Sequence, residues 1–203
     1  MSRQLRLVFL VTALIVLAGA GGWLAASSLL PYEYHGQELR PPQPVADFTL
    51  TAAGDRRVSL SQFRGKLVLL YFGYTFCPDV CPTTLAELGR GLRKMGDRAA
   101  DIQVIVITVD PERDTPARLA EYVGHFDPTF IGLTGAAEQI AAVAQGLGIH
   151  YQKREGTAAS GYLVDHTASV LALDRTGALR LLFPFGAPGE EIAEDLRRLL
   201  DER

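Results

Sequence analysis

The sequence predicts an α/β protein in which a mixed sheet is flanked by helices and preceded by one N-terminal transmembrane helix. Three observations support this prediction. An uncharged, mostly apolar stretch opens the 203-residue chain. Two nearly continuous apolar runs, Leu67–Tyr74 and Ile102–Val109, are typical of strands buried on both faces of a sheet. Helical and strand patterns alternate around these runs, and an antiparallel hairpin with a helix closes the chain.

The N-terminal stretch is long enough to cross a membrane. Residues 7–32 contain no charge, and about 20 residues at ~1.5 Å each span the ~30 Å hydrocarbon layer. Arg3 and Arg6 precede the stretch and the next Lys or Arg is Arg40, so the positive-inside rule places the N-terminus in the cytoplasm. We therefore expect a transmembrane anchor over residues 1–30, in a single-pass protein of the bacterial inner membrane with its soluble domain in the periplasm.

A tether and a single domain are predicted to follow. Residues 31–44 form a polar, proline-containing stretch that suits a tether holding the domain off the membrane. Residues 45–203 are enough for one ordinary domain with its own core. The alternative to an anchor is a signal peptide cleaved at the small residues 18–20, and in that case the domain is exported as well.

Composition and charge exclude several classes of protein. The formal net charge of −3 offers no basic surface, so we expect no nucleic-acid partner. Two cysteines cannot form a disulfide scaffold, and a domain of this size does not need one. Because the two cysteines lie close together in the sequence, they indicate a redox or metal site.

Local patterns predict the elements of the domain in order. Phe48–Thr51 and Val58–Leu60 flank a turn and form a hairpin, and the buried strand Leu67–Tyr74 leads into a helix over Thr83–Met95 with leucines on one face. After the second buried strand, Thr115 suits a helix N-cap and the following proline suits the first helical position. The remaining elements are expected to be a helix over Pro116–Val123, a strand at Phe130–Leu133, a helix over Ala136–Gln145, weaker strands at Ile149–Lys153 and Tyr162–Val164, a hairpin of Ser169–Leu173 and Leu179–Phe183, and a helix over Glu190–Leu200. This order fits a thioredoxin-like arrangement.

The cysteines stand at the end of the first buried strand. Cys77 and Cys81 are four residues apart, a spacing that places two helical side chains on one face, ~5–6 Å apart. Such a pair can bridge one metal ion or close a disulfide. Because Pro82 is comfortable at the first helical position, we expect the helix to begin near it, and the positive end of the helix to favour thiolate. A structural disulfide is the alternative, although so short a loop stabilises a fold weakly.

The four histidines are the candidates for a third ligand to a metal ion held by the two cysteines. Cu(I) is a soft ion that prefers thiolates, with imidazole as a suitable companion. His35 lies in the tether, His125 ends a helix, and His150 begins a weak strand. His166 lies in the segment before the apolar strand near Ser169. In a thioredoxin-like fold this segment faces the cysteine turn, so His166 is the preferred ligand. His150 and a plain structural role for His166 stay open, and zinc, which usually takes four ligands, is the rival metal.

Several segments resemble the SCO/SenC family. Residues 71–82 (YFGYTFCPDVCP) resemble the family's signature, residues 108–115 and 132–135 resemble its downstream blocks, and residues 165–167 (DHT) resemble the stretch with its metal-binding histidine. The similarity runs from about Val45 to the C-terminus. The resemblance implies a thioredoxin-like fold that binds one copper through Cys77, Cys81 and His166. It also implies a role in assembling the binuclear copper centre of cytochrome c oxidase.

The resemblance sets further expectations about partners and chemistry. Copper is expected as Cu(I), with Cu(II) as a second state to consider. The expected partners are the copper-centre subunit of the oxidase, another copper chaperone as donor, and the membrane. The family is credited with delivering copper, with reducing the target's cysteines, or with both. A copper metallochaperone is therefore expected, and a thiol–disulfide oxidoreductase with Cys77 and Cys81 as redox-active residues is the alternative. A peroxidase of the peroxiredoxin kind is disfavoured because its motif is missing.

Three groups of residues near the motif have more than one interpretation. The charged loop Asp110–Asp114 fits a solvated turn or a docking surface. Asp79 fits a partner contact or a first-turn acid that complements the helix dipole. The aromatic residues of this region are expected in the core, with one of them walling the metal site: Tyr71, Phe72, Tyr74 and Phe76.

Overall fold

The computed structural model describes residues 32–157 and 161–202, together with residues 4, 10, 12, 14–19 and 22. The chain divides into two units, residues 1–33 and 34–203. The described residues up to 22 are helical. Within the described part of the chain, no helix is both long and apolar enough to cross a membrane. The anchor expected over residues 1–30 lies mostly outside the described residues and stays a prediction.

The core of the second unit is a six-stranded mixed sheet with the strand order β1-β10-β9-β4-β5-β6. The central strand β4 pairs in parallel with β5 and antiparallel with β9, and β5 pairs in parallel with β6. Every residue of β4 is buried, as its continuous apolar sequence predicts. The strands are β1 (Gln37–Pro44), β4 (Leu67–Gly73), β5 (Ile102–Thr108), β6 (Ile131–Leu133), β9 (Val170–Leu173) and β10 (Ala178–Phe183). The predicted mixed α/β fold is confirmed.

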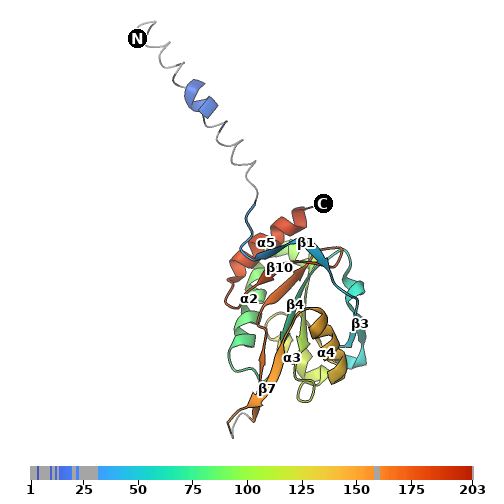
Figure 1. The fold of residues 1–203 in the computed structure, drawn as a ribbon. Coiled ribbons are helices and arrows are strands. Elements are labelled where there is room, and N and C mark those ends of the chain that lie inside the picture. The colour runs from blue at the N-terminus through green and yellow to red at the C-terminus, as the bar shows by residue number, and fades with distance from the viewer. Residues whose placement is uncertain are drawn as a thin grey trace. The chain divides into compact units, whose positions relative to one another are not determined.

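Four helices cover the sheet, with α2 and α5 on one side of the central strands and α3 and α4 on the other (Figure 1). Their bounds are α2 (Val80–Met95), α3 (Pro116–Gly124), α4 (Ala137–Gly146) and α5 (Gly189–Asp201). Thr115 caps α3 by accepting from the Arg118 N–H, as predicted. Helices α2 and α5 approach so closely that a Cβ on Gly189 would lie 2.4 Å from the Glu87 carbonyl oxygen. Glycine is therefore required at this contact.

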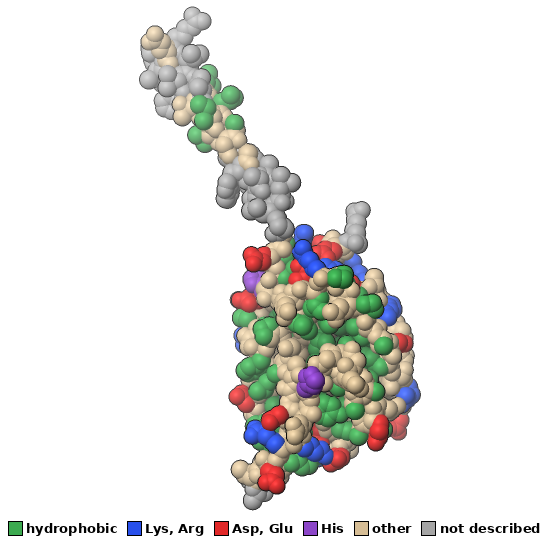
Figure 2. Space-filling view, in the orientation of Figure 1, with side chains coloured by type: hydrophobic (Ala, Val, Ile, Leu, Met, Phe, Trp, Pro, Cys, Tyr) green, Lys and Arg blue, Asp and Glu red, His purple; other side chains and the backbone are tan. Residues whose placement is uncertain are grey.

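Two small sheets stand apart from the six-stranded one. β2 (Thr49–Thr51) pairs with β3 (Arg57–Ser59), and β7 (Tyr151–Glu155) pairs with β8 (Tyr162–His166). The short 3₁₀ helices are η1 (Ala53–Asp55), η2 (Leu60–Phe63) and η3 (Gly96–Asp101). On the face in Figure 2, hydrophobic side chains gather near the middle of the domain and charged side chains lie mainly around its rim. The β7–β8 hairpin ends at His166, one of the three predicted metal ligands.

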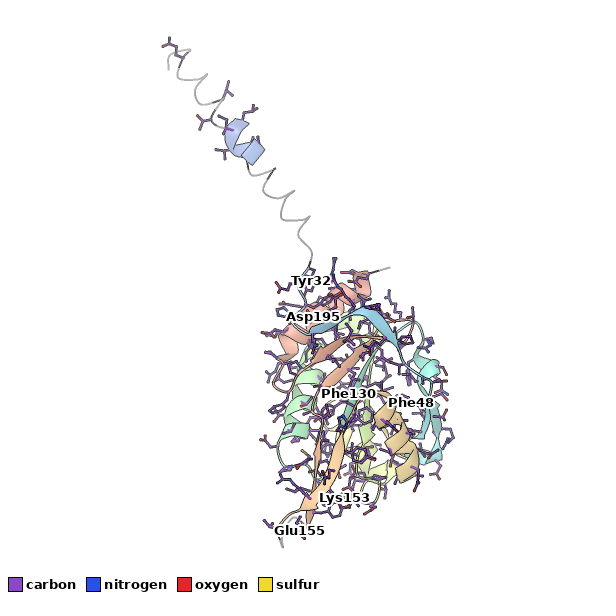
Figure 3. All side chains as sticks on the ribbon, viewed as in Figure 1. Tyr32, Phe48, Phe130, Lys153, Glu155 and Asp195 are labelled. Carbon is purple, nitrogen blue, oxygen red and sulfur yellow. The ribbon has the colours of Figure 1, made fainter. Side chains whose placement is uncertain are left out.

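Residues 37–44 differ from the expectation of a tether. They form the edge strand β1, which pairs antiparallel with β10, with a register irregularity between Glu38 and Gln43. An edge strand tolerates prolines because one of its sides needs no ladder partner. The buried carboxylate of Asp195 fixes the start of this segment by accepting from the N–H groups of His35 (3.1 Å) and Gly36 (2.8 Å) (Figure 3).

The start of α2 also differs from the prediction. The helix begins at Val80, two residues before Pro82. Proline fits at the third helical position because the N–H groups of the first turn have no partner within the helix. Cys81 therefore belongs to the first turn of α2, while Cys77 lies in the turn before it.

Candidate metal site

Cys77, Cys81 and His166 come together beyond the end of β4. Their ligand atoms all lie within 4.8 Å of one another, and the group could hold a metal ion. The Cys81 Sγ and His166 Nε2 atoms are 3.3 Å apart. Cys77 comes from the β4–α2 connection, Cys81 from the first turn of α2, and His166 from the last position of β8. The structure thus brings together the three side chains that the sequence selected.

The two sulfurs have different environments and different acidities. The Cys81 N–H donates to the Cys77 Sγ over 3.3 Å. The pKa of Cys77 is lowered, first by the side-chain hydrogen bond from Cys81 and then by those from His166 and from backbone N–H groups. The pKa of Cys81 is raised by the same pairing with Cys77 and by burial. The pairing thus favours ionisation of Cys77 over ionisation of the more buried Cys81.

The His166 ring is oriented for binding through Nε2. Its Nδ1 lies 3.0 Å from the Thr167 carbonyl oxygen. A carbonyl oxygen can only accept, so Nδ1 carries a proton and donates it to Thr167, which leaves Nε2 as the ring atom that faces the sulfurs. The rings of Tyr71 and Tyr74 contact the imidazole edge-on, each with a centroid separation of 6.0 Å. The backbone and the two aromatic rings thus fix the tautomer and the orientation of His166.

Access to the group is one-sided. The Cys81 side chain is 1% exposed, whereas Cys77 and His166 are half-buried. A hollow of about 230 Å³ lies beside Cys77 and His166, with Asp79 and Asp165 on its lining. An ion or a partner group can therefore reach Cys77 and His166 from solvent, while Cys81 forms the floor of the site.

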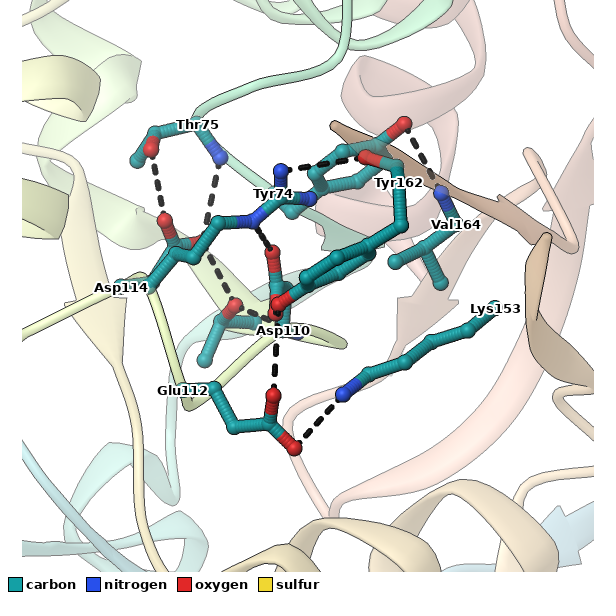
Figure 4. A network of polar contacts seen from close by, with 10 residues as sticks. Tyr74, Thr75, Asp110, Glu112, Asp114, Lys153, Tyr162 and Val164 are labelled. Atoms are coloured by element: carbon teal, nitrogen blue, oxygen red, sulfur yellow. Dashed lines mark hydrogen bonds and ion pairs between the residues drawn. The ribbon is translucent and has the colours of Figure 1, made fainter. Parts of the chain in front are cut away.

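Two buried aspartates tie the segments of the site together (Figure 4). Asp114 accepts hydrogen bonds from the Thr75 N–H (3.1 Å), the Thr75 hydroxyl (2.6 Å) and the Thr108 hydroxyl (2.6 Å). Thr75 opens the turn that leads to Cys77. Asp114 therefore links this turn to β5 and to the loop that follows it.

The second aspartate acts on the histidine strand. Asp110 accepts from Arg113 and from the Tyr162 hydroxyl, the latter over 2.6 Å. The Arg113 guanidinium also faces the ring of Phe76, with 4.5 Å from its carbon to the centroid. In addition, the Val164 N–H donates to the Tyr74 hydroxyl over 3.2 Å. These contacts join β8, which ends at His166, to the cysteine side of the site.

The network corrects one interpretation of the sequence. Apart from the family resemblance, the loop 110–114 was expected to be a solvated turn, with a docking surface as the alternative, but Asp110 and Asp114 are both 0% exposed. Their carboxylates are buried because hydroxyl, N–H and guanidinium donors surround them. The sequence shows only that these aspartates follow a buried strand. It does not show their hydrogen-bond donors, several of which come from segments far away in the chain.

The other sequence candidates lie outside the group of three. His35 contacts Glu194 at 3.0 Å, His125 is the C-cap of α3, and His150 is exposed at the start of β7. Asp79 is at the N-cap position of α2 but makes no side-chain capping bond. Of the four aromatic residues expected in the core, Tyr71, Phe72 and Tyr74 are buried, whereas Phe76 is 44% exposed.

The fold and the site together define a class: α/β proteins with a cysteine pair at a helix N-terminus and a histidine from a neighbouring hairpin. The SCO1/SenC family model matches residues 36–201, and the chain belongs to this family. The predicted family is confirmed.

Known proteins similar to this chain include both curated relatives and solved structures. The chain is 36% identical over 200 residues to the mitochondrial protein SCO2 homolog of Bos taurus. The aligned region covers 96% of this chain and 75% of the relative. The apo Sco1 protein from Thermus thermophilus is 41% identical with a TM-score of 0.75, over 83% of this chain and 98% of that one. The structure of Bradyrhizobium japonicum ScoI with copper bound is 41% identical with a TM-score of 0.71, over 77% and 99%.

Proposed function

We propose that this protein is a copper metallochaperone that binds one copper ion through Cys77, Cys81 and His166. In this proposal it assists assembly of the binuclear copper centre of cytochrome c oxidase, the role that the family resemblance implies. The observation that supports it is the convergence of two sulfurs and one imidazole nitrogen within 4.8 Å. Bradyrhizobium japonicum ScoI, 41% identical, is described with copper bound, which supports copper as the cargo.

The donor set favours Cu(I) over zinc. Thiolate and imidazole are ligands that suit Cu(I), whereas structural zinc is almost always held by four ligands. The group found among the described residues has three members. We propose Cu(I) as the transferred form, with Cu(II) as a second state. Binding removes the proton of Cys81, so one proton is released as the ion takes up both sulfurs.

Exposure suggests how copper is handed over. Cys77 and His166 face solvent and Cys81 does not. In the proposed transfer, a thiol or imidazole of the copper-centre subunit first replaces Cys77 or His166, and Cys81 leaves last. Loading from a donor chaperone runs in the reverse order.

Copper binding and its ligands are tested with matched histidine variants. A competition titration of the wild-type protein is expected to give one copper per chain, with two sulfurs and one nitrogen in the first shell by X-ray absorption. His166→Ala is expected to weaken binding by orders of magnitude. His150→Ala, at an exposed histidine outside the group, is expected to match wild type. Unchanged affinity in His166→Ala would refute His166 as a ligand.

A second function, thiol–disulfide reduction, is favoured by the unequal acidity of the cysteines. The Cys77 thiolate would attack a target disulfide and form a mixed disulfide as one target sulfur leaves with a proton. Cys81 would then lose its proton and attack Cys77, which releases the second target thiol and closes a Cys77–Cys81 disulfide. In a single-turnover assay, Cys81→Ser is expected to trap the mixed disulfide and Cys77→Ser to be inactive. His166→Ala separates the two functions. It is expected to lose copper binding and to keep disulfide reduction, because the reduction step uses only the two cysteines.

We further propose that residues 1–30 anchor the protein in the bacterial inner membrane with the domain in the periplasm. The uncharged stretch and the arginines before it support this topology. Resistance to carbonate extraction, together with digestion of the domain by protease added to spheroplasts, is the expected result. Release into the soluble periplasmic fraction would instead indicate a cleaved signal.

A further inference from the structure

Tyr71 holds a buried hydroxyl that makes no hydrogen bond within the part of the chain that the structure describes. The residue lies in the middle of β4 and is 0% exposed. Leaving a buried hydroxyl unpaired is unfavourable, because the group loses its hydrogen bonds to water and gains none in return. Phenylalanine would fill the same space without this penalty. The hydroxyl therefore points to a hydrogen-bond acceptor that becomes available in another state of the site.

The ring of Tyr71 lies against two of the three proposed ligands. A Cβ placed on Gly73 would be 2.8 Å from Tyr71 Cε1 and 3.0 Å from Cys81 Sγ, so the ring and the sulfur meet over the same glycine. The ring also contacts the edge of His166 at an interplanar angle of 78°. The pKa of Tyr71 is raised chiefly by burial, then by charge on Cys81 and by the closeness of the hydroxyl to the Cys81 side chain, although the two groups do not meet hydrogen-bond geometry in the metal-free protein.

We propose that the Tyr71 hydroxyl donates a hydrogen bond to the Cys81 sulfur when that sulfur is a metal-bound thiolate. The inference rests on the proposed copper function. A thiol sulfur is a weak acceptor. A metal-bound thiolate is a charged acceptor, which forms a stronger hydrogen bond. Metal binding thus supplies the partner that the hydroxyl lacks.

The hydrogen bond has a consequence for the oxidation state of the cargo. A donor to a ligating sulfur withdraws electron density from it, and hydrogen bonds to such sulfurs are among the features that tune metal reduction potentials. The more electron-demanding Cu(II) loses more from this withdrawal than Cu(I) does. Tyr71 is therefore a positioning residue that favours the Cu(I) form of the site.

Thr84 is the rival acceptor for the hydroxyl. Its side chain is buried in α2, and its own hydroxyl donates to the Val80 carbonyl oxygen over 2.8 Å. The Thr84 oxygen can therefore still accept a hydrogen bond. Its closeness to the Tyr71 hydroxyl lowers the pKa of Tyr71, against the larger effects of burial and Cys81. If Thr84 takes the hydrogen bond in the metal-bound state, the copper–sulfur bond does not respond to the Tyr71 hydroxyl. The two arrangements therefore differ in the spectrum of the copper site.

The experiment compares Tyr71→Phe with Tyr122→Phe in the copper-loaded protein. Tyr122 is a demanding control, because its hydroxyl is also buried and unpaired among the described residues and its pKa is likewise raised by burial and by charge on Cys81 and Cys77. Its ring, however, packs on Phe126 and not on His166. Tyr71→Phe is expected to shift the thiolate-to-Cu(II) absorption band to lower energy. It is also expected to lower the ratio of Cu(I) affinity to Cu(II) affinity by about tenfold, which is at the lower end of the effects seen when a group that contacts a metal ligand is removed. Tyr122→Phe is expected to match wild type in both.

The metal-free variant supplies an independent readout. Tyr71→Phe is expected to melt at the same temperature as wild type or higher, because it removes an unpaired polar group. A variant that loses stability or fails to fold overturns the inference, since the hydroxyl then has a structural partner without metal. An unshifted band in Tyr71→Phe, or an equal shift in Tyr122→Phe, overturns it as well. If wild type binds no copper, it is the proposed function that fails.

Discussion

The Arg113 guanidinium lies over the ring of Tyr162, 3.7 Å from the ring centroid, and donates from Nη1 to the Tyr162 carbonyl oxygen over 3.1 Å. Arg113 belongs to the loop after β5, and Tyr162 is the first residue of β8. In the described sheets, β8 pairs with β7 and not with the six-stranded sheet. Side-chain contacts such as this one therefore determine where His166 lies relative to the cysteines.

Weakening this contact is expected to weaken metal binding. Arg113→Lys keeps a positive charge beside the buried Asp110 but loses the planar stacking and the forked donors. We expect copper affinity to fall about 10-fold, as for other groups that orient a ligand, with the fold retained. Competition titration checks the affinity, and circular dichroism checks the fold.

The control for Arg113→Lys is Lys153→Ala. Lys153 also faces the Tyr162 ring, but its pair with Glu112 (2.6 Å) is exposed. An exposed pair contributes about 0–1 kcal/mol, so this variant is expected to bind copper like wild type. If both variants lost affinity equally, Arg113 would have no special role in positioning His166.

Replacing Asp114 is expected to destabilise the fold. Its carboxylate accepts three hydrogen bonds inside the protein, and Asp114→Ala leaves the donors without a partner. A loss of about 2–4 kcal/mol in the free energy of unfolding follows from one to two unpaired buried groups. Urea denaturation measures it, and Asp97→Ala, at an exposed acid of η3, should stay near wild type. Equal stability of the two variants would contradict this account.

The two cysteines are expected to react at very different rates with iodoacetamide. The lowered pKa of Cys77 means that its thiolate persists as the pH falls below 8 and is lost only when the pH passes through that lowered value. The raised pKa of Cys81 and its burial keep it as an unreactive thiol over the same range. Peptide mapping by mass spectrometry at several pH values measures both rates. Similar rates, or the steep loss of Cys77 reactivity below pH 8 typical of an ordinary thiol, would argue against the assignment.

Gly73 is expected to tolerate no side chain, although its backbone is unstrained. A Cβ at this position would meet Tyr71 and Cys81 at 3.0 Å or less. Gly73→Ala should therefore displace the Cys81 sulfur, weaken copper binding, and reduce stability by about 1–3 kcal/mol, as overpacked cores do. Gly124→Ala, where a Cβ meets nothing within 4 Å, is the control. Wild-type copper affinity in Gly73→Ala would show that the sulfur has room to move.

Patterns local to the chain predicted much of this fold. The apolar runs of β4 and β5 fixed the sheet centre, and the Thr115-Pro116 pair marked the start of α3. The strand β1 was missed because its prolines disfavour a strand unless it lies at an edge, and edge position is a property of the whole sheet. The burial of Asp110 depends on Tyr162, 52 residues away, and no local pattern reports such a partner.

The cysteine and histidine candidates were found for a different reason. Soft-metal chemistry restricts the ligands to a few residue types, and this chain has only two cysteines. The direction of the thiol pKa shifts could not be predicted to that extent. It depends on how the two sulfurs pair and on the deeper burial of Cys81, which only the folded structure shows. Tyr71 likewise looked like an ordinary core residue until the surroundings of its hydroxyl were known.

The separation of the β7–β8 hairpin from the main sheet has a thermodynamic consequence. An ion bound by Cys77, Cys81 and His166 would be a cross-link between two pieces of structure that share no backbone ladder. Part of its binding free energy would then appear as protection of the hairpin against opening. Amide hydrogens of Tyr151–Glu155 would therefore exchange more slowly in the metal-bound protein than in the metal-free protein. Transfer of the ion to a partner would return their exchange to the faster rate.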